Sequence, residues 1–214
     1  LCYSTAEYCA PVWAQSSHIK LIYVQLKTTM RIISGTLRPT PLSWLPVLSN
    51  IPPPHLGRQE ASTKALAKVY AREKLPLYMD ITSHPAVRLT SRHPVWLSSL
   101  PEDITAISAW RVEWSSTDVV NHSLVAEPSV CPPGFNLPRH LRTTLNRFRT
   151  GQCRYAVNFV RWDQATNSSC CCGALQTTSH IVNNCPLTKF PGGKQALRFA
   201  DDDVVKWLST NCTR

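Results

Sequence analysis

The sequence lacks a long hydrophobic run. No stretch approaches the roughly 18 consecutive apolar residues that a transmembrane helix needs, which argues against a membrane-spanning protein. It also lacks a secretory signal, and its 9 cysteines include three adjacent ones, which do not form a spaced disulfide framework. We therefore expect an intracellular protein, in the cytoplasm or nucleus, that does not act at a membrane.

Acidic residues are scarce. There are 13 Asp and Glu against 23 Lys and Arg, which gives a formal net charge of +10. From residue 128 to residue 161 there is no acidic residue, yet there are six arginines. This imbalance points to RNA or DNA as the partner rather than a small-molecule substrate.

Strand-like alternation is also sparse, and the apolar residues mostly follow a helical period. We expect helices from Ser17 to Gly35, around Trp44, over 55–74, from Pro101 past Trp114, over 138–150 and after Asp201. The prolines between 75 and 100 predict an irregular linker. The predicted fold class is mainly α, with a helical segment 1–74, a linker 75–100, a helical connector 101–135 and a C-terminal domain 136–214.

Cysteine and histidine cluster near the C-terminus. Cys170, Cys172, His180 and Cys185 form the pattern C-x-C-G-x6-H-x4-C-P, which offers the four ligands of a closed, structural Zn²⁺ site. The C-x-C spacing is tighter than usual, so Cys171 is an alternative ligand. Four residues between the last two ligands would let one helical turn bring them together. The competing interpretation is a loop with reduced, solvated cysteines.

The expected helix 138–150 places two stripes side by side. Leu141, Leu145 and Phe148 form an apolar stripe, and a neighbouring polar stripe suits phosphate contacts. With the arginines that follow, the candidate nucleic-acid contacts are Arg139, Arg142, Asn146, Arg147, Arg149 and Arg154. The alternative is a solvated basic face. Phe148, Tyr155, Phe159 and Trp162 are interleaved with this region and are expected in the core rather than stacked on bases.

Phe199-Ala200-Asp201-Asp202 matches the metal-binding turn of reverse transcriptase palms. A palm also needs another aspartate far upstream on a strand, and no earlier segment has that pattern. We therefore interpret these acids as the cap and first turn of a last helix, and expect no catalytic residue here.

Four stretches carry a resemblance to a known family: YSTAEYCAPVW, QLKTTMRIISGTLRPTPLSWLPVLSNIPPPHL, PPGFNLPRHLRTTLNRFRTGQC and CCCGALQTTSHIVNNCP. They resemble the C-terminal part of the reverse transcriptase of non-LTR (LINE-type, jockey- and CR1-like) retrotransposons, an RNA-directed DNA polymerase. The resemblance implies a helical thumb followed by a Cys/His domain that binds template RNA or target DNA. It marks, besides the four knuckle ligands, Tyr8, Pro11, Trp13, His18, Arg31, Gly35, Pro41, Trp44, Asn146, Arg147, Arg149, Thr150 and Gly151.

The resemblance also implies missing parts. The palm and fingers are absent, so we expect no polymerase activity, and we expect an exposed apolar patch where the thumb would contact the palm. Where the family usually has glycine this chain has Cys153, which predicts backbone strain if that position requires a positive φ. The alternative functions are a structural zinc-stapled or protein-binding remnant, and an enzyme, either a residual polymerase that uses Asp201 and Asp202 or a nuclease.

Overall fold

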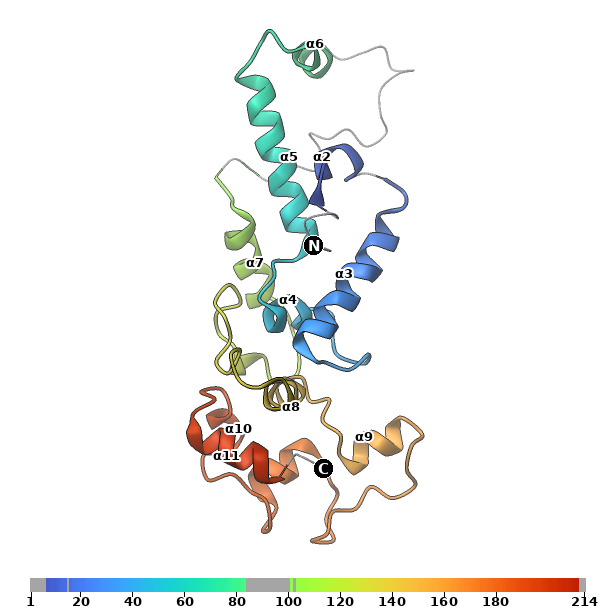
Figure 1. Ribbon diagram of the computed structural model, residues 1–214, viewed down its shortest axis with the longest axis vertical. Helices are drawn as coiled ribbons and strands as arrows, with labels where there is room; N and C mark the ends of the chain where they lie inside the picture. The colour runs from blue at the N-terminus through green and yellow to red at the C-terminus, as the bar shows by residue number, and fades with distance from the viewer. Residues whose placement is uncertain (1–6, 15, 84–100, 102, 212–214) are drawn as a thin grey trace. The chain divides into compact units, whose positions relative to one another are not determined.

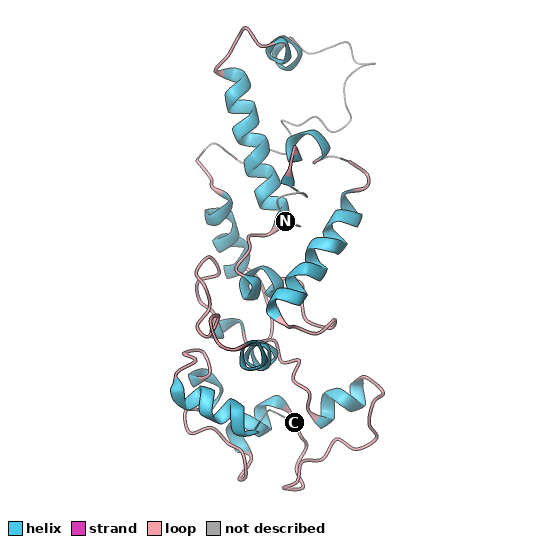
Figure 2. Ribbon diagram, viewed as in Figure 1, coloured by secondary structure: helices cyan, strands magenta, loops and turns pink. Residues whose placement is uncertain are grey.

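A computed structural model describes residues 7–14, 16–83, 101 and 103–211 of the chain. Helices joined by loops make up this part, and it contains no named strand (Figure 2). Extended pairing there is limited to an isolated antiparallel bridge between Ser169 and Leu175. The predicted mainly α class is confirmed. No helix in these ranges is both long enough and apolar enough to cross a membrane.

The chain divides into two compact units. Unit 1 takes residues 1–29 and 52–115, and unit 2 takes residues 30–51 and 116–214. These units do not coincide with the segments expected from the sequence, because residues 30–51 belong with the C-terminal part. Two hydrogen bonds tie them there: Asn146 Nδ2 donates to the Ser34 carbonyl (2.9 Å), and Trp44 Nε1 donates to the Val120 carbonyl (3.3 Å).

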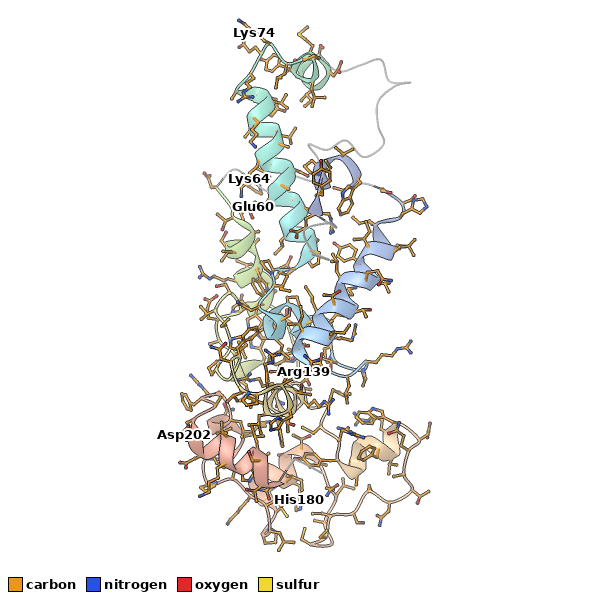
Figure 3. All side chains as sticks on the ribbon, viewed as in Figure 1. Glu60, Lys64, Lys74, Arg139, His180 and Asp202 are labelled. Atoms are coloured by element: carbon orange, nitrogen blue, oxygen red, sulfur yellow. The ribbon has the colours of Figure 1, made fainter. Side chains whose placement is uncertain are left out.

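Unit 1 is built around α5 (Pro54–Tyr70), which contacts α2 (Ala10–Trp13), α6 (Pro76–Thr82) and α7 (Ala106–Ser115) (Figure 1). The first turns of α3 (Ile19–Ser34) also belong to this unit. Leu66, Val69 and Ile81 are buried together where α5 meets α6. The surface of α5 carries an ion pair between Lys64 and Glu60, 2.7 Å apart (Figure 3).

Two expectations for unit 1 were wrong. The proline-rich stretch from residue 75 contains the helix α6, because Pro76 lies in its first turn, where the missing N–H costs nothing. Residues 84–100 of the expected linker lie outside the described residues. Helix α7 begins at Ala106 rather than at Pro101, because Thr105 and Ser108 cap it reciprocally: each side-chain oxygen accepts the other's backbone N–H.

Unit 2 contains the last turn of α3, which ends as expected at Gly35, and α4 (Trp44–Ser49). A short 3-10 turn, η3 (His122–Leu124), precedes α8 (Arg139–Arg149) and α9 (Ala156–Arg161). The chain then forms a π-helical turn, η4 (His180–Asn184), followed by α10 (Gly193–Ala196) and α11 (Asp202–Asn211) (Figure 1).

The core of unit 2 confirms the predicted apolar stripe of α8. Leu141, Leu145 and Phe148 are buried and belong to a cluster that includes Trp207 and Leu208 of α11. Helix α11 is capped by Asp201, whose Oδ1 accepts the backbone N–H of Val204 (2.9 Å). The interpretation of this acid as a helix cap is therefore confirmed.

Candidate metal centre and cationic groove

Four side chains converge in the C-terminal third of unit 2. The ligand atoms of Cys170, Cys172, His180 and Cys185 all lie within 4.8 Å of one another. The Sγ atoms of Cys170 and Cys185 are 3.8 Å apart, and Cys172 Sγ lies 3.1 Å from His180 Nε2. This group could hold a metal ion.

A tight hairpin positions the first two thiols. The Cys170 N–H donates to the Ala174 carbonyl (2.7 Å), and the Gly173 N–H donates back to the Cys170 carbonyl (2.8 Å). Gly173 has a φ of +88°, which a residue with a side chain rarely adopts. The hairpin therefore turns Cys170 and Cys172 toward the same point within three residues.

The π-helical turn η4 positions the other two ligands. The Cys185 N–H donates to the carbonyl of His180 (2.7 Å), an i→i+5 bond, so four residues separate the ligands while their backbones are joined directly. Thr177 Oγ1 accepts the His180 N–H (3.0 Å) and holds the start of this turn. Figure 3 marks His180 in this segment. The sequence predicted a helical turn here, and the structure specifies a π-turn.

Cys171 stands apart from the group. Its side chain is exposed and is not among the converging ligands, which resolves the choice among the three adjacent cysteines. Cys170 and Cys185 are buried and belong to the core of unit 2. The pKa of the Cys185 thiol is lowered to about 6. Burial raises this pKa, but hydrogen bonds from Thr188 and from the Leu187 backbone together lower it by more. Such a thiol is readily available as a thiolate ligand.

Two of the six predicted nucleic-acid contacts point into the protein. Asn146 and Arg149 are each only 1% exposed. The guanidinium of Arg149 donates to the Pro133 carbonyl (2.6 Å) and to Asn146 Oδ1 (3.2 Å), and burial lowers the pKa of Arg149 to about 10. Both side chains thus support the fold and are not available at the surface.

Arg142 is also used within the protein. Its Nη1 donates to the Phe135 carbonyl (3.0 Å), and its guanidinium lies over the Phe135 ring, 5.2 Å from the centroid. Arg142 does not line the groove described next.

The remaining three arginines come together. Arg139, Arg147 and Arg154 line an open groove of about 820 Å³, which we call the cationic groove (Figure 3 labels Arg139). Its other lining residues are His140, Thr143, Thr144, Phe148, Cys153, Tyr155 and Asn211. The sequence analysis missed the polar ones, although His140 and Thr144, like Arg139, Thr143 and Arg147, follow a four-residue spacing on α8.

No acid balances these charges. The lining contains no Asp or Glu, and within the described ranges no ion pair involves Arg139, Arg147 or Arg154. The pKa of Arg147 is lowered by its partial burial and then by the positive charge of Arg154. Arg139 also donates to the Ile32 carbonyl (2.8 Å), and Arg154 lies over the Phe159 ring, 5.7 Å from its centroid. These contacts position the two side chains but neutralise neither charge, so the groove keeps a positive charge that favours an anion.

Of the four interleaved aromatic residues, one is buried and three are half-buried. Phe148 is buried, as expected, and Tyr155 packs edge-on against it with ring centroids 5.7 Å apart. Phe159 and Trp162 form a second edge-on pair, 5.8 Å apart. Tyr155, Phe159 and Trp162 are half-buried rather than buried in the core, and of these three Tyr155 alone lines the cationic groove.

The strain expected at Cys153 was wrong. Cys153 is buried in the core and is not among the described residues with a positive φ, whereas Gly151, two residues earlier, has a φ of +67°. The turn after α8 therefore places its left-handed residue at Gly151, and Cys153 contributes packing.

No protein-family model matches this chain, and no curated protein or solved structure matches it either.

Proposed function

We propose that unit 2 is a zinc-stapled module that binds nucleic acid through the cationic groove. The observation that carries the proposal is the groove itself, where three arginines and His140 face a shared hollow with no carboxylate. Phosphate oxygens are the anions that arginine forks pair with best, and each contact releases counterions from the nucleic acid.

Zinc is the metal that fits the ligand group best. Three thiolates and one imidazole form a soft, four-ligand set, and tetrahedral bonds of about 2.3 Å to sulfur place neighbouring sulfur atoms about 3.8 Å apart. The separation of Cys170 and Cys185 agrees with that edge. Four protein ligands leave no open position, so the ion would stabilise the fold and would not activate water.

The sequence motifs extend the proposal to a parent protein. The thumb-like and Cys/His motifs resemble the C-terminal part of a non-LTR retrotransposon reverse transcriptase. We propose that the chain is such a part and binds template RNA or target DNA beside the missing palm and fingers. Three of the six side chains first considered, Arg142, Asn146 and Arg149, support this role only through the fold.

Binding across a salt series tests the proposal. The variant with Arg139→Gln, Arg147→Gln and Arg154→Gln should bind RNA or DNA more weakly, and the slope of log affinity against log salt should fall by about two units for a single strand. Fluorescence anisotropy with a labelled oligonucleotide measures both quantities.

A matched control removes the same charge elsewhere. Lys20, Lys68 and Arg72 are exposed and do not line the groove, so replacing these three with glutamine should change the slope little. Equal losses in both triple variants would mean that only net charge matters, and a flat salt response in the unaltered protein would refute nucleic-acid binding. In that case the zinc-stapled unit would serve a structural or protein-binding role.

A further inference from the structure

A second hollow lies next to the cationic groove. It has a volume of about 210 Å³, and we call it the polar hollow. Its lining residues are Val120, Asn121, Gly151, Tyr155, Val157, Asn158, Arg161, Gln176, Thr177, Thr178, Ser179 and Lys194. Two of these are cations and none is acidic, so the hollow shares the charge character of the groove.

Tyr155 lines both hollows. It directly precedes α9, in an extended conformation, and its ring packs edge-on against Phe148 with an interplanar angle of 67°. The buried Phe148 fixes the position of the Tyr155 ring, while the half-buried ring remains partly accessible. A fixed aromatic ring between two cationic hollows has the composition of a stacking platform with phosphate contacts on either side.

We infer that the two hollows form one track for single-stranded nucleic acid, with an unpaired base stacked on Tyr155. Phosphates on one side of that base meet Arg139, Arg147 and Arg154, and phosphates on the other side meet Arg161 and Lys194. This inference rests on the proposed function and adds the class of ligand. A duplex keeps its bases stacked on one another, so it could meet the arginines but would leave the Tyr155 ring unused.

The first test compares strands and variants of the whole 214-residue chain, loaded with zinc, at constant salt. A single-stranded RNA should bind more tightly than a duplex of the same length. Tyr155→Leu should weaken single-strand binding about tenfold or more, while Tyr155→Phe, which keeps the ring, should bind like the unaltered protein. Unchanged binding by Tyr155→Leu, or equal binding of duplex and single strand, would overturn the inference.

The second test uses oligonucleotide length. Arg161→Gln with Lys194→Gln should weaken binding of strands long enough to reach both hollows and leave the shortest binding strands unaffected. Lys189→Gln with Arg198→Gln, which removes two exposed charges outside both hollows, is the control. A loss of affinity that is the same at every length would contradict a continuous track.

A third measurement does not depend on the folding of a variant. A uridine oligonucleotide with a photoreactive base, crosslinked to the unaltered protein, should attach at or beside Tyr155 when mapped by mass spectrometry. Crosslinks found only elsewhere would refute the platform even though the protein binds nucleic acid. Failure of the proposed function looks different, because the unaltered protein would then bind neither strand in a salt-dependent way.

Discussion

Cys171 offers a sharp comparison at the scale of single residues, because it lies between two converging ligands yet is itself exposed. Cys185→Ser should abolish metal retention, since it removes a buried thiolate from a four-ligand set, and should destabilise unit 2 by several kcal/mol. Cys171→Ser should retain one zinc per chain and unchanged stability. Metal analysis together with thermal unfolding monitored by circular dichroism measures both. Metal loss in both variants would contradict the assigned ligand set.

Asn146 provides a second prediction at this scale. Its amide joins the Ser34 carbonyl to the guanidinium of Arg149, and all three groups are buried. Asn146→Ala should lower the free energy of unfolding by about 2 kcal/mol, because it leaves a buried carbonyl and part of a buried cation without partners. Urea unfolding measures the change. Thr144→Ala, on the same helix but partly exposed, should cost less than half as much.

The inward role of Asn146 and Arg149 could not be predicted from helical periodicity. A helical pattern places them on the same stripe as Arg139, beside the apolar face. Whether that stripe meets solvent depends on which distant segment covers it. Here the backbone carbonyls of Ser34 and Pro133 cover it. Every residue has a backbone carbonyl, so the sequence near α8 gives no sign of which carbonyls will accept these hydrogen bonds.

At the scale of elements, Gly35 allows the end of α3 to lie close to α8. Its φ is +68°, and a Cβ added there would lie 2.1 Å from Thr143 Oγ1. Gly35→Ala should therefore destabilise the protein by about 2–4 kcal/mol, through backbone strain and the clash together. Gly151 has nearly the same φ, +67°, but its added Cβ would lie 3.4 Å from the nearest atom, in Val120. Gly151→Ala should cost about 1–2 kcal/mol. Equal costs, measured by urea unfolding, would mean that α8 does not approach Gly35 this closely.

The elements differ in how well the sequence predicts them. Helix α8 follows from its apolar spacing and α11 from Asp201, because both signals are local. Helix α6 was not predicted, because a proline was interpreted as a helix breaker although it lies in the first turn. The start of α7 was predicted too early, because the acids after Pro101 were interpreted as the helix start instead of the Thr105 and Ser108 capping pair. For the metal centre, ligand spacing was sufficient; the choice of Cys172 over Cys171 required the fold of the hairpin.

At the scale of the whole molecule, the two compact units should respond differently to metal removal. The ligand cysteines belong to the core of unit 2, whereas the cluster of Leu66, Val69 and Ile81 lies in unit 1. If zinc is bound, chelation should accelerate amide hydrogen exchange across α8 and α11 and leave α5 nearly unchanged, because the ligand cysteines are part of the core that α8 and α11 share. Mass spectrometry of exchanged peptides resolves the two. Uniform acceleration would mean that the units unfold as one.

The expected contact with a palm stays a prediction at this scale. Within unit 1, α3 exposes Leu21 (66%) and Val24 (58%), apolar side chains one helical turn apart. Exposed apolar residues on one helix face suit a partner surface.

The π-turn that joins His180 to Cys185 sets a rule for sequence change in this loop. Ile181 and Val182 are buried, while Asn183 and Asn184 are exposed. An exposed position such as Asn184 can exchange its side chain, yet losing a single residue would shorten the turn to an α-type step and swing the thiol away from the imidazole. Selection on this loop should therefore conserve its length more strictly than its residue identities, so related chains should differ there by substitutions more often than by deletions.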